Sequence, residues 1–178
     1  MAILKIARMG HPVLLAQAQP VTDILSPEIQ RLLADMVETL EDAGGVGLAA
    51  PQVFASHRLF IYYVPASRAD TGTQVPLRAV INPVITPLSE DTILGWEGCL
   101  SIPGLRAAVP RFTHIRLTAE DEDGTPFTQD LSGFEARIVQ HDTDHLNGTL
   151  YPMRMADFRY FGFNEELDRF PLPLPEIL

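Results

Sequence analysis

The chain has one cysteine, few cations and no long apolar run, and each shortage excludes a class of protein. Cys99 is the only cysteine among 178 residues, so no intrachain disulfide holds the fold, and we expect a reducing cytoplasm as its location. The net charge of -10 argues against a nucleic-acid groove or an anionic membrane as partner. No apolar run approaches the roughly 20 residues of a membrane span, and we expect no signal or transit peptide.

Two helices are predicted from end signals and apolar spacing. Ser26 is placed to cap a helix that starts at Pro27 and stops at Gly44, with apolar residues at helical spacing between them. Ser132 and Glu135 have the spacing of a capping box, which predicts a second helix that ends near Asn147-Gly148.

Several short segments are typical of β-strands. Leu59 to Val64 and Arg78 to Ile81 are rich in β-formers and bounded by proline, and Arg111 to Glu120 alternates before a turn at residues 121–124. Pro171, Pro173 and Pro175 predict a loose C-terminal tail from about residue 168. We therefore expect one α+β domain over residues 1–178, with largely antiparallel sheets.

The second predicted helix carries a histidine pair. His141 and His145 are four residues apart, so their imidazoles lie on one helix face at the separation that a single metal ion needs. Hydrolytic metal enzymes commonly carry H-E-x-x-H, whose acid deprotonates a water held by the metal. Asp142 is the acid at that position here. The pattern predicts half of a metal site.

A catalytic site of this kind needs a third protein ligand, for which Cys99 is the candidate. Cys99 lies between Gly98 and Leu100-Ser101, where small residues let the backbone approach an ion. The alternative is that Cys99 is a small buried apolar residue, the more common environment of a single cysteine.

A glycine-rich stretch, Gly45 to Gln52, precedes these segments. It matches the loose G-x-G-x-x-A nucleotide fingerprint, but it follows a helix and meets Pro51, whereas the fingerprint follows a strand and opens a helix. We instead expect that its glycines let another backbone lie alongside, with the Gln52 amide held rigidly beside Pro51.

Together the three segments resemble the peptide deformylase family, whose motifs are G-x-G-L-A-A-P-Q, E-G-C-L-S and Q-H-E-x-D-H-L. They correspond to Gly45 to Gln52, Glu97 to Ser101 and Gln140 to Leu146, and the likeness extends from Gly10 to about Leu167. The resemblance implies the deformylase fold, with its sheets packed around the metal-bearing helix. It implies removal of the formyl group from N-formylmethionyl peptides, with release of formate.

The resemblance also implies roles for single residues. Cys99, His141 and His145 would hold one divalent ion, Fe(2+) in many members, with Zn(2+), Ni(2+) or Co(2+) as substitutes. Asp142 would move the proton of the attacking water, and the Gln52 amide and the Leu100 N–H would stabilise the oxyanion.

The family also binds its substrate in a characteristic way. The peptide would add as a strand beside Gly45, Val46, Gly47 and Gly98, and Ile138 and Arg106 are candidate walls of the methionine pocket. Glu97 and Asp144 would either orient the ligand imidazoles or pair with Arg106 or Arg111.

Two departures from the family pattern leave alternatives open. Asp142 replaces the usual Glu and is one methylene shorter. It can act as the base if the helix lies nearer the metal, or if a second water relays the proton. The alternative function is a deformylase-like paralogue with weak or no activity, which binds metal or hydrolyses another small formyl or acyl compound. The acidic, aromatic segment from Phe158 to Leu178 does not match the basic helix with which some members dock on ribosomes, so nascent chains at the ribosome remain only a candidate partner.

Overall fold

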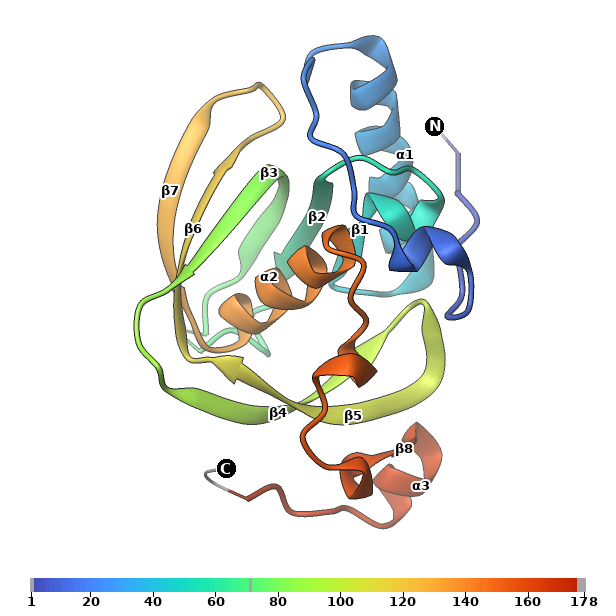
Figure 1. Cartoon of the computed structure of the whole chain (residues 1–178), viewed down its shortest axis with the longest axis vertical. Helices are drawn as coiled ribbons and strands as arrows, with labels where there is room; N and C mark the ends of the chain where they lie inside the picture. Colours follow the sequence, from blue (N-terminus) through green and yellow to red (C-terminus); the bar gives the residue numbers. More distant parts are fainter. Residues whose placement is uncertain (1, 71, 176–178) are drawn as a thin grey trace.

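The computed structural model describes residues 2–70 and 72–175, and its strands form two antiparallel sheets (Figure 1). The larger sheet has the order β1-β2-β3-β6-β7, with β1 (Gly47–Ala49), β2 (Leu59–Val64), β3 (Val75–Pro87), β6 (His114–Glu120) and β7 (Pro126–Ser132). The smaller sheet has the order β4-β5-β8, with β4 (Thr92–Cys99), β5 (Ile102–Phe112) and β8 (Phe161–Phe163). Both β1 and β4 are therefore edge strands.

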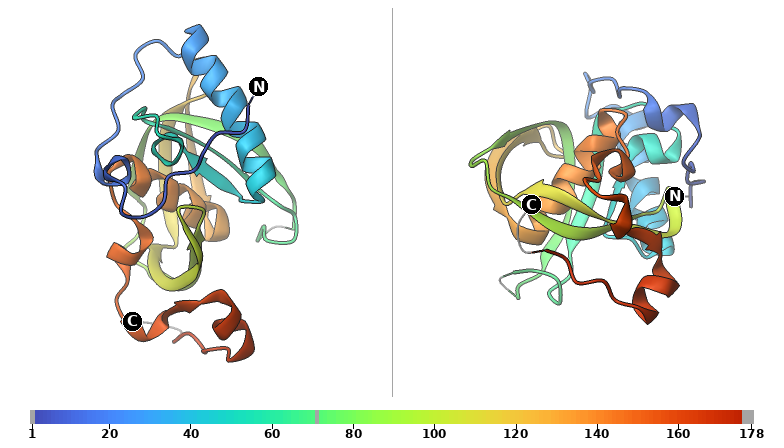
Figure 2. Two further views of the ribbon diagram at one scale, coloured as in Figure 1. Left: turned by 90° about the vertical axis from the view of Figure 1, so that its right-hand side faces the viewer. Right: turned by 60° about the horizontal axis from the view of Figure 1, so that its bottom comes forward.

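Helix α2 (Gly133–Leu146) lies between the two sheets and contacts β1, β2 and β5. Helix α1 (Pro27–Ala43) packs beside β1 and β2, and the short helix α3 (Asn164–Arg169) follows β8 at one end of the molecule (Figure 2). Short 3-10 helices connect these elements at Pro12–Leu15, Ala50–Val53, Tyr151–Arg154 and Phe158–Tyr160. The predicted α+β fold, with antiparallel sheets around the histidine-bearing helix, is confirmed.

The predicted first helix is also confirmed, but its predicted cap is wrong, because the Ser26 side chain makes no capping hydrogen bond and instead donates to the Asp23 carbonyl at 2.8 Å. Helix α1 ends at Gly44, whose φ of 64° is the left-handed conformation that glycine adopts without strain. Its buried side, which includes Ile29, Leu33 and Met36, packs into a cluster with β2 and β3.

The single strand predicted over Arg111 to Glu120 is wrong. β5 ends at Phe112 and β6 begins at His114, and the two strands belong to different sheets. The chain leaves one sheet at Thr113, where the backbone N–H donates to the Asp91 carbonyl at 3.0 Å instead of to a neighbouring strand. Apolar residues alternate from Ile115 to Ala119, but Phe112 and Ile115 are three residues apart, so the alternation does not extend back across this junction.

The predicted capping box is wrong as well, although helix α2 begins and ends where expected. The Ser132 side chain makes no capping hydrogen bond. Glu135 instead accepts a hydrogen bond from the Tyr62 hydroxyl at 2.8 Å, which ties the first turn of α2 to β2.

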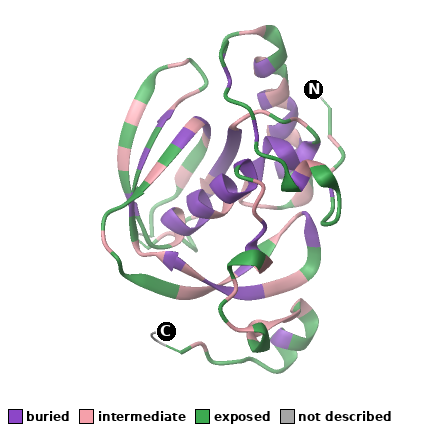
Figure 3. Ribbon diagram, in the orientation of Figure 1, coloured by how far each residue is buried: buried purple, intermediate pink, exposed green. Residues whose placement is uncertain are grey.

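Helix α2 is buried along most of its length (Figure 3). Its apolar residues, among them Ala136 and Val139, join a cluster with β2, β6 and β7. Gln140, Asp142 and His145 are buried on the same helix, and buried polar groups require partners or a function.

The C-terminal segment continues past the second helix. The predicted tail starts inside α3, residues 171–175 belong to no helix or strand, and residues 176–178 lie outside the described residues. Among the described residues, no helix is both long and apolar enough to cross a membrane.

Candidate active site

Helix α2 and the end of β4 bring the three predicted metal ligands together. The ligand atoms of Cys99, His141 and His145 lie within 4.8 Å of one another, and the Cys99 Sγ is 3.3 Å from the His145 Nε2. Burial alone would raise the pKa of Cys99, but the two imidazoles lower it well below its usual range, which favours the thiolate that binds metals. The predicted Cys-His-His metal site is confirmed as a grouping.

Glu97 fixes the orientation of the first histidine. Its Oε2 lies 2.9 Å from the His141 Nδ1, and because a carboxylate only accepts, Nδ1 donates and the Nε2 remains for a metal. Arg111 donates to both carboxylate oxygens at 2.9 and 3.0 Å, and Arg137 donates to Oε1 at 2.9 Å. Burial would raise the pKa of Glu97, but the hydrogen bonds from His141 and Arg111 lower it far below its usual range. Glu97 therefore both orients an imidazole and pairs with arginines.

Asp144 pairs with arginines rather than with a ligand imidazole. It accepts from Arg111 at 2.6 Å and from Arg154 at 2.7 Å. Arg106, the other predicted partner, is paired with Asp168 at 2.7 Å. Arg111 thus lies between two buried carboxylates, Glu97 and Asp144, and joins β5 to both β4 and α2.

Asp142 has a carboxylate oxygen without a partner in the described residues. Asp142 is 2% exposed, and its Oδ2 is buried and accepts no hydrogen bond from the described residues. Burial raises the pKa of Asp142 to about 7, with His141 and His145 acting in the opposite direction. A Cβ built on Gly47 would overlap this carboxylate, so the acid lies directly against the backbone of β1.

Gln52 is held by hydrogen bonds at both ends of its amide. Its Oε1 accepts from the Ala49 N–H at 2.8 Å, and its Nε2 donates to the Ser101 Oγ at 3.1 Å and lies 3.5 Å from the Cys99 Sγ. Leu100 lies with Ser101 in the turn between β4 and β5. These contacts place the Gln52 amide and the Leu100 backbone beside Cys99.

A cavity of about 460 Å³ opens onto these groups. Most predicted site residues line it: Gly45, Val46, Gly47, Gln52, Glu97, Gly98, Cys99, Leu100, Ile138, His141 and Asp142. Arg106 is outside this lining, because its guanidinium pairs with Asp168 and lies over the Trp96 ring at 5.5 Å. Asp144 and His145 are likewise outside the lining.

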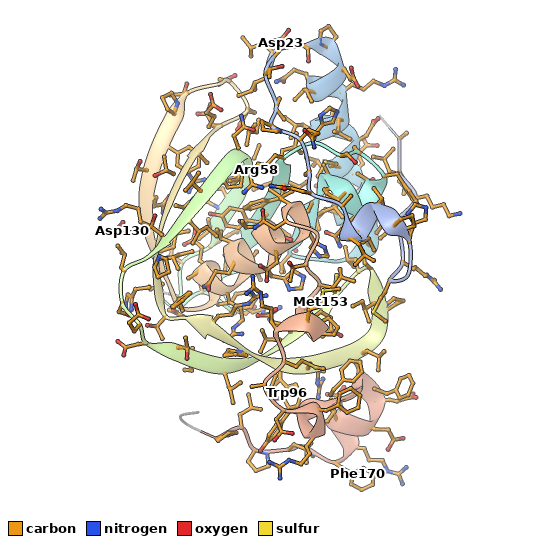
Figure 4. All side chains as sticks on the ribbon, viewed as in Figure 1. Asp23, Arg58, Trp96, Asp130, Met153 and Phe170 are labelled. Carbon is orange, nitrogen blue, oxygen red and sulfur yellow. The ribbon has the colours of Figure 1, made fainter. Side chains whose placement is uncertain are left out.

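The sequence did not single out several residues of this site. Arg137 lies one turn before the first histidine and donates to Glu97 and to the Val109 carbonyl at 2.8 Å. Trp96 forms part of the cavity wall beside the C-terminal segment (Figure 4), where its ring is 6.5 Å from that of Tyr160. Arg68 and Asn164 also line the cavity. Arg137 could have been predicted from the sequence, because it lies four residues before His141 on the same helix face. The other residues reach the site only through tertiary contacts.

Comparison with known proteins places this geometry among enzymes of one kind. A model of the polypeptide deformylase family matches residues 3–160. Peptide deformylase 1 of Xanthomonas axonopodis pv. citri is 49% identical over 166 residues, which cover 93% of this chain and 97% of the relative. Peptide deformylase 2 of Pseudomonas putida is 48% identical over 165 residues, which cover 91% and 93%.

Solved structures agree with the sequence relatives. A class I type b peptide deformylase of Acinetobacter baumannii with bound Met-Ala-Ser has a TM-score of 0.81 at 35% identity, covering 86% of this chain and 99% of that one. The peptide deformylase of Thermus thermophilus has a TM-score of 0.76 at 44% identity, covering 86% of each chain.

Proposed function

Because the chain belongs to the polypeptide deformylase family, we propose that its Cys-His-His site hydrolyses the formyl amide of N-formylmethionyl peptides, with Asp142 as the base. The observation that carries this assignment is a buried carboxylate oxygen of Asp142, without a hydrogen-bond partner in the described part of the chain, beside three converging metal ligands. Such an arrangement can hold an ion and move a proton next to it. The products are formate and a free amino terminus.

The residues present fit a divalent ion. Cys99, His141 and His145 supply one sulfur and two nitrogens, and Glu97 already fixes the tautomer of His141. When bound, the ion supplies a Lewis acid that lowers the pKa of a water and polarises the formyl oxygen. We propose Fe(2+) as the native ion, with Zn(2+), Ni(2+) or Co(2+) as substitutes, since all four accept this donor set.

Asp142 is the group that moves the proton. Its free Oδ2 can accept a proton from the attacking water and later donate it to the leaving amine of the methionine. The contact with Gly47 fixes the direction of the short side chain. The backbone of β1 therefore limits where the carboxylate can lie.

Gln52 and Leu100 stabilise the charge that develops on the formyl oxygen. The Gln52 amide is held by the Ala49 N–H, so its Nε2 is oriented before the substrate binds. The Leu100 N–H lies in the turn that follows Cys99. The hydrogen bond to the Gln52 amide and the position of Leu100 next to Cys99 support these two roles.

The peptide lies between the two sheet edges. β1 and β4 are edge strands. Near both edges the cavity is lined by glycines, which leave the backbone accessible, and by one larger residue, Val46; the glycines are Gly45, Gly47 and Gly98. An extended peptide can pair with such edges through its own backbone, which makes binding tolerant of the sequence after methionine. Ile138 provides an apolar wall for the methionine side chain.

We further propose that the natural substrates are nascent chains in the cytoplasm. Helix α3 carries Glu165, Glu166 and Asp168 against Arg169, so it lacks the positive charge that a helix needs to dock on ribosomal RNA. The enzyme would meet nascent chains by diffusion. Co-sedimentation with ribosomes at low salt, if observed, would contradict this mode of encounter.

The test of the activity is formate release from a formyl-Met peptide by iron-loaded enzyme under anaerobic conditions. Peptide-dependent formate release that Cys99→Ala abolishes is the expected result. Hydrolysis of an unformylated peptide without formate release would instead identify an endopeptidase.

A further inference from the structure

Among the residues that the structure describes, one cation of the cavity wall has no carboxylate partner. The charged side chains of the wall are Arg68, Glu97, Arg137 and Asp142, in addition to His141. Glu97 and Arg137 are paired with each other at 2.9 Å. Arg68 makes no ion pair with any acidic group in residues 2–70 and 72–175. It is available to a ligand.

Contact with an aromatic ring holds Arg68 in place. Its guanidinium lies over the Phe134 ring, 3.8 Å from the centroid. The loop is fixed by hydrogen bonds from the Arg68 and Ala69 N–H groups to the Pro65 carbonyl, at 2.9 and 3.1 Å. Burial lowers the pKa of Arg68, because the contact removes part of its hydration. An anion that pairs with the guanidinium would replace that hydration.

The topology shows which part of a substrate passes Arg68. Asp142 lies against Gly47, so the formyl group of a bound peptide lies near that residue. The peptide cannot continue toward Leu48 and Ala49, which are fully buried and absent from the cavity wall. It must therefore run toward Gly45.

Arg68 lies at that same end of β1. Gly47 pairs with Tyr62, and the Tyr63 N–H donates to the Val46 carbonyl at 2.9 Å, so β2 runs past Gly45 into the loop that carries Arg68. At about 3.3 Å per residue, the distance from Gly47 to Gly45 corresponds to two residues of an extended peptide. The residues after the methionine thus reach the loop.

We propose that Arg68 binds a carboxylate on the second or third residue of the formylated peptide and gives this enzyme a preference for acidic sequences after methionine. This specificity rests on the proposed deformylase function. The chain's net charge of -10 would otherwise disfavour such substrates. One oriented guanidinium offsets that repulsion locally, since its planar donors match a carboxylate.

The test compares isosteric substrates that differ only in charge. We would measure kcat/KM for formyl-Met-Asp-Ala and formyl-Met-Asn-Ala, and for formyl-Met-Ala-Asp and formyl-Met-Ala-Asn, all as C-terminal amides. The expected preference of the parent for the Asp peptide at one position is about threefold to tenfold. The free acid of formyl-Met-Ala, compared with its amide, shows whether a terminal carboxylate is bound in the same way.

Variants at Arg68 separate charge from packing. Arg68→Gln should abolish the preference, and Arg68→Glu should reverse it. Arg169→Gln is the matched control, because Arg169 also lies over a ring, that of Phe170 at 5.2 Å, but does not line the cavity. It should keep the preference of the parent.

Two results would overturn the proposal: equal kcat/KM for the Asp and Asn peptides in the parent, or an unchanged preference in Arg68→Gln. Calorimetry with the deformylated products Met-Asp-Ala and Met-Asn-Ala, as amides, measures the same ratio without turnover. An enzyme that binds the Asp product more tightly but releases no formate from any peptide would contradict the proposed function and support the role of Arg68.

Discussion

Asp142 and Gly47 share one small space. The carboxylate lies where any side chain at position 47 would have to be, and its Oδ2 has no hydrogen-bond partner in the described part of the chain. The length of the acid and the absence of a side chain on β1 are therefore coupled. A change in either should alter the position of the base without altering the three metal ligands.

We predict opposite effects for two substitutions of Asp142. Asp142→Asn should lower kcat by about 10² or more, because an amide cannot accept the proton. Asp142→Glu should raise kcat by roughly 10- to 100-fold, because the added methylene gives the base the reach of the Glu in the family motif, and a misplacement of about 1 Å can cost on the order of a hundredfold in rate. Steady-state formate release and metal content of each variant are the measurements. A slower Glu variant with full metal would show that the site is adapted to aspartate.

At the scale of single residues, the sequence predicted the site residues that lie close to one another along the chain. His141 and His145 are related by one helical turn, and the neighbours of Cys99 and Gln52 form short motifs, so their roles could be proposed without a structure. Arg68 and Asn164 come from segments far from these motifs. Their presence in the cavity depends on the path of a loop and of the C-terminal segment, which no local pattern encodes.

Among the elements, β1 is an edge strand in which Gly47 leaves space for the Asp142 side chain of helix α2. Gly47→Ala would place a methyl group on the Asp142 carboxylate and should lower kcat by about tenfold or more while the metal stays bound. Gly162→Ala on β8 is the control, because its methyl group would make ordinary contact with Leu167 at 3.4 Å. Equal activity of both variants would show that the carboxylate can move without loss.

The contact between β5 and α2 depends on a buried arginine. Arg111→Met should lower the free energy of unfolding by about 3 to 5 kcal/mol, because it leaves Glu97 and Asp144 without a shared partner. Arg116→Met removes an exposed ion pair with Asp130 and should leave the urea midpoint close to that of the parent. Urea unfolding of the metal-loaded proteins compares the two. Similar midpoints for both variants would mean that α2 does not need Arg111.

The elements that could be predicted have strong end signals. Helix α1 lies between Pro27 and Gly44, and β2 is an unbroken apolar run from Leu59 to Val64. β4 contains Gly95 and Gly98 and has no such signal, although it carries Cys99. A Cβ on Gly95 would overlap the Arg137 guanidinium, so this glycine reflects packing against α2, which only the tertiary structure reveals.

For the whole molecule, the metal site connects two parts of the fold. Cys99 comes from the smaller sheet, and His141 and His145 come from the helix that packs on the larger one. An ion held by all three would therefore link the sheets. The stability of the protein should depend on its metal.

Removal of the ion should accordingly lower Tm. An ion present at a hundred times its Kd contributes about 2.7 kcal/mol, which corresponds to roughly 5 to 10 °C for a chain of this length. Calorimetry before and after chelation measures the shift, and Cys99→Ala should melt near the chelated parent and not respond to added metal. An unchanged Tm after verified metal loss would show that the two sheets hold together without the ion.

The shortness of β1 has a consequence for solubility. An exposed strand edge invites other chains to pair with it, and at high protein concentration the nearest candidate is another copy of the same protein. β1 has only three residues, Gly47–Ala49, and two of them, Leu48 and Ala49, are fully buried, so its edge offers too few backbone hydrogen bonds to hold two folded molecules together. The same edge can still accept a flexible peptide end that the opposite wall also holds. The short edge of β1 should therefore bind an extended peptide without promoting self-association of the folded protein.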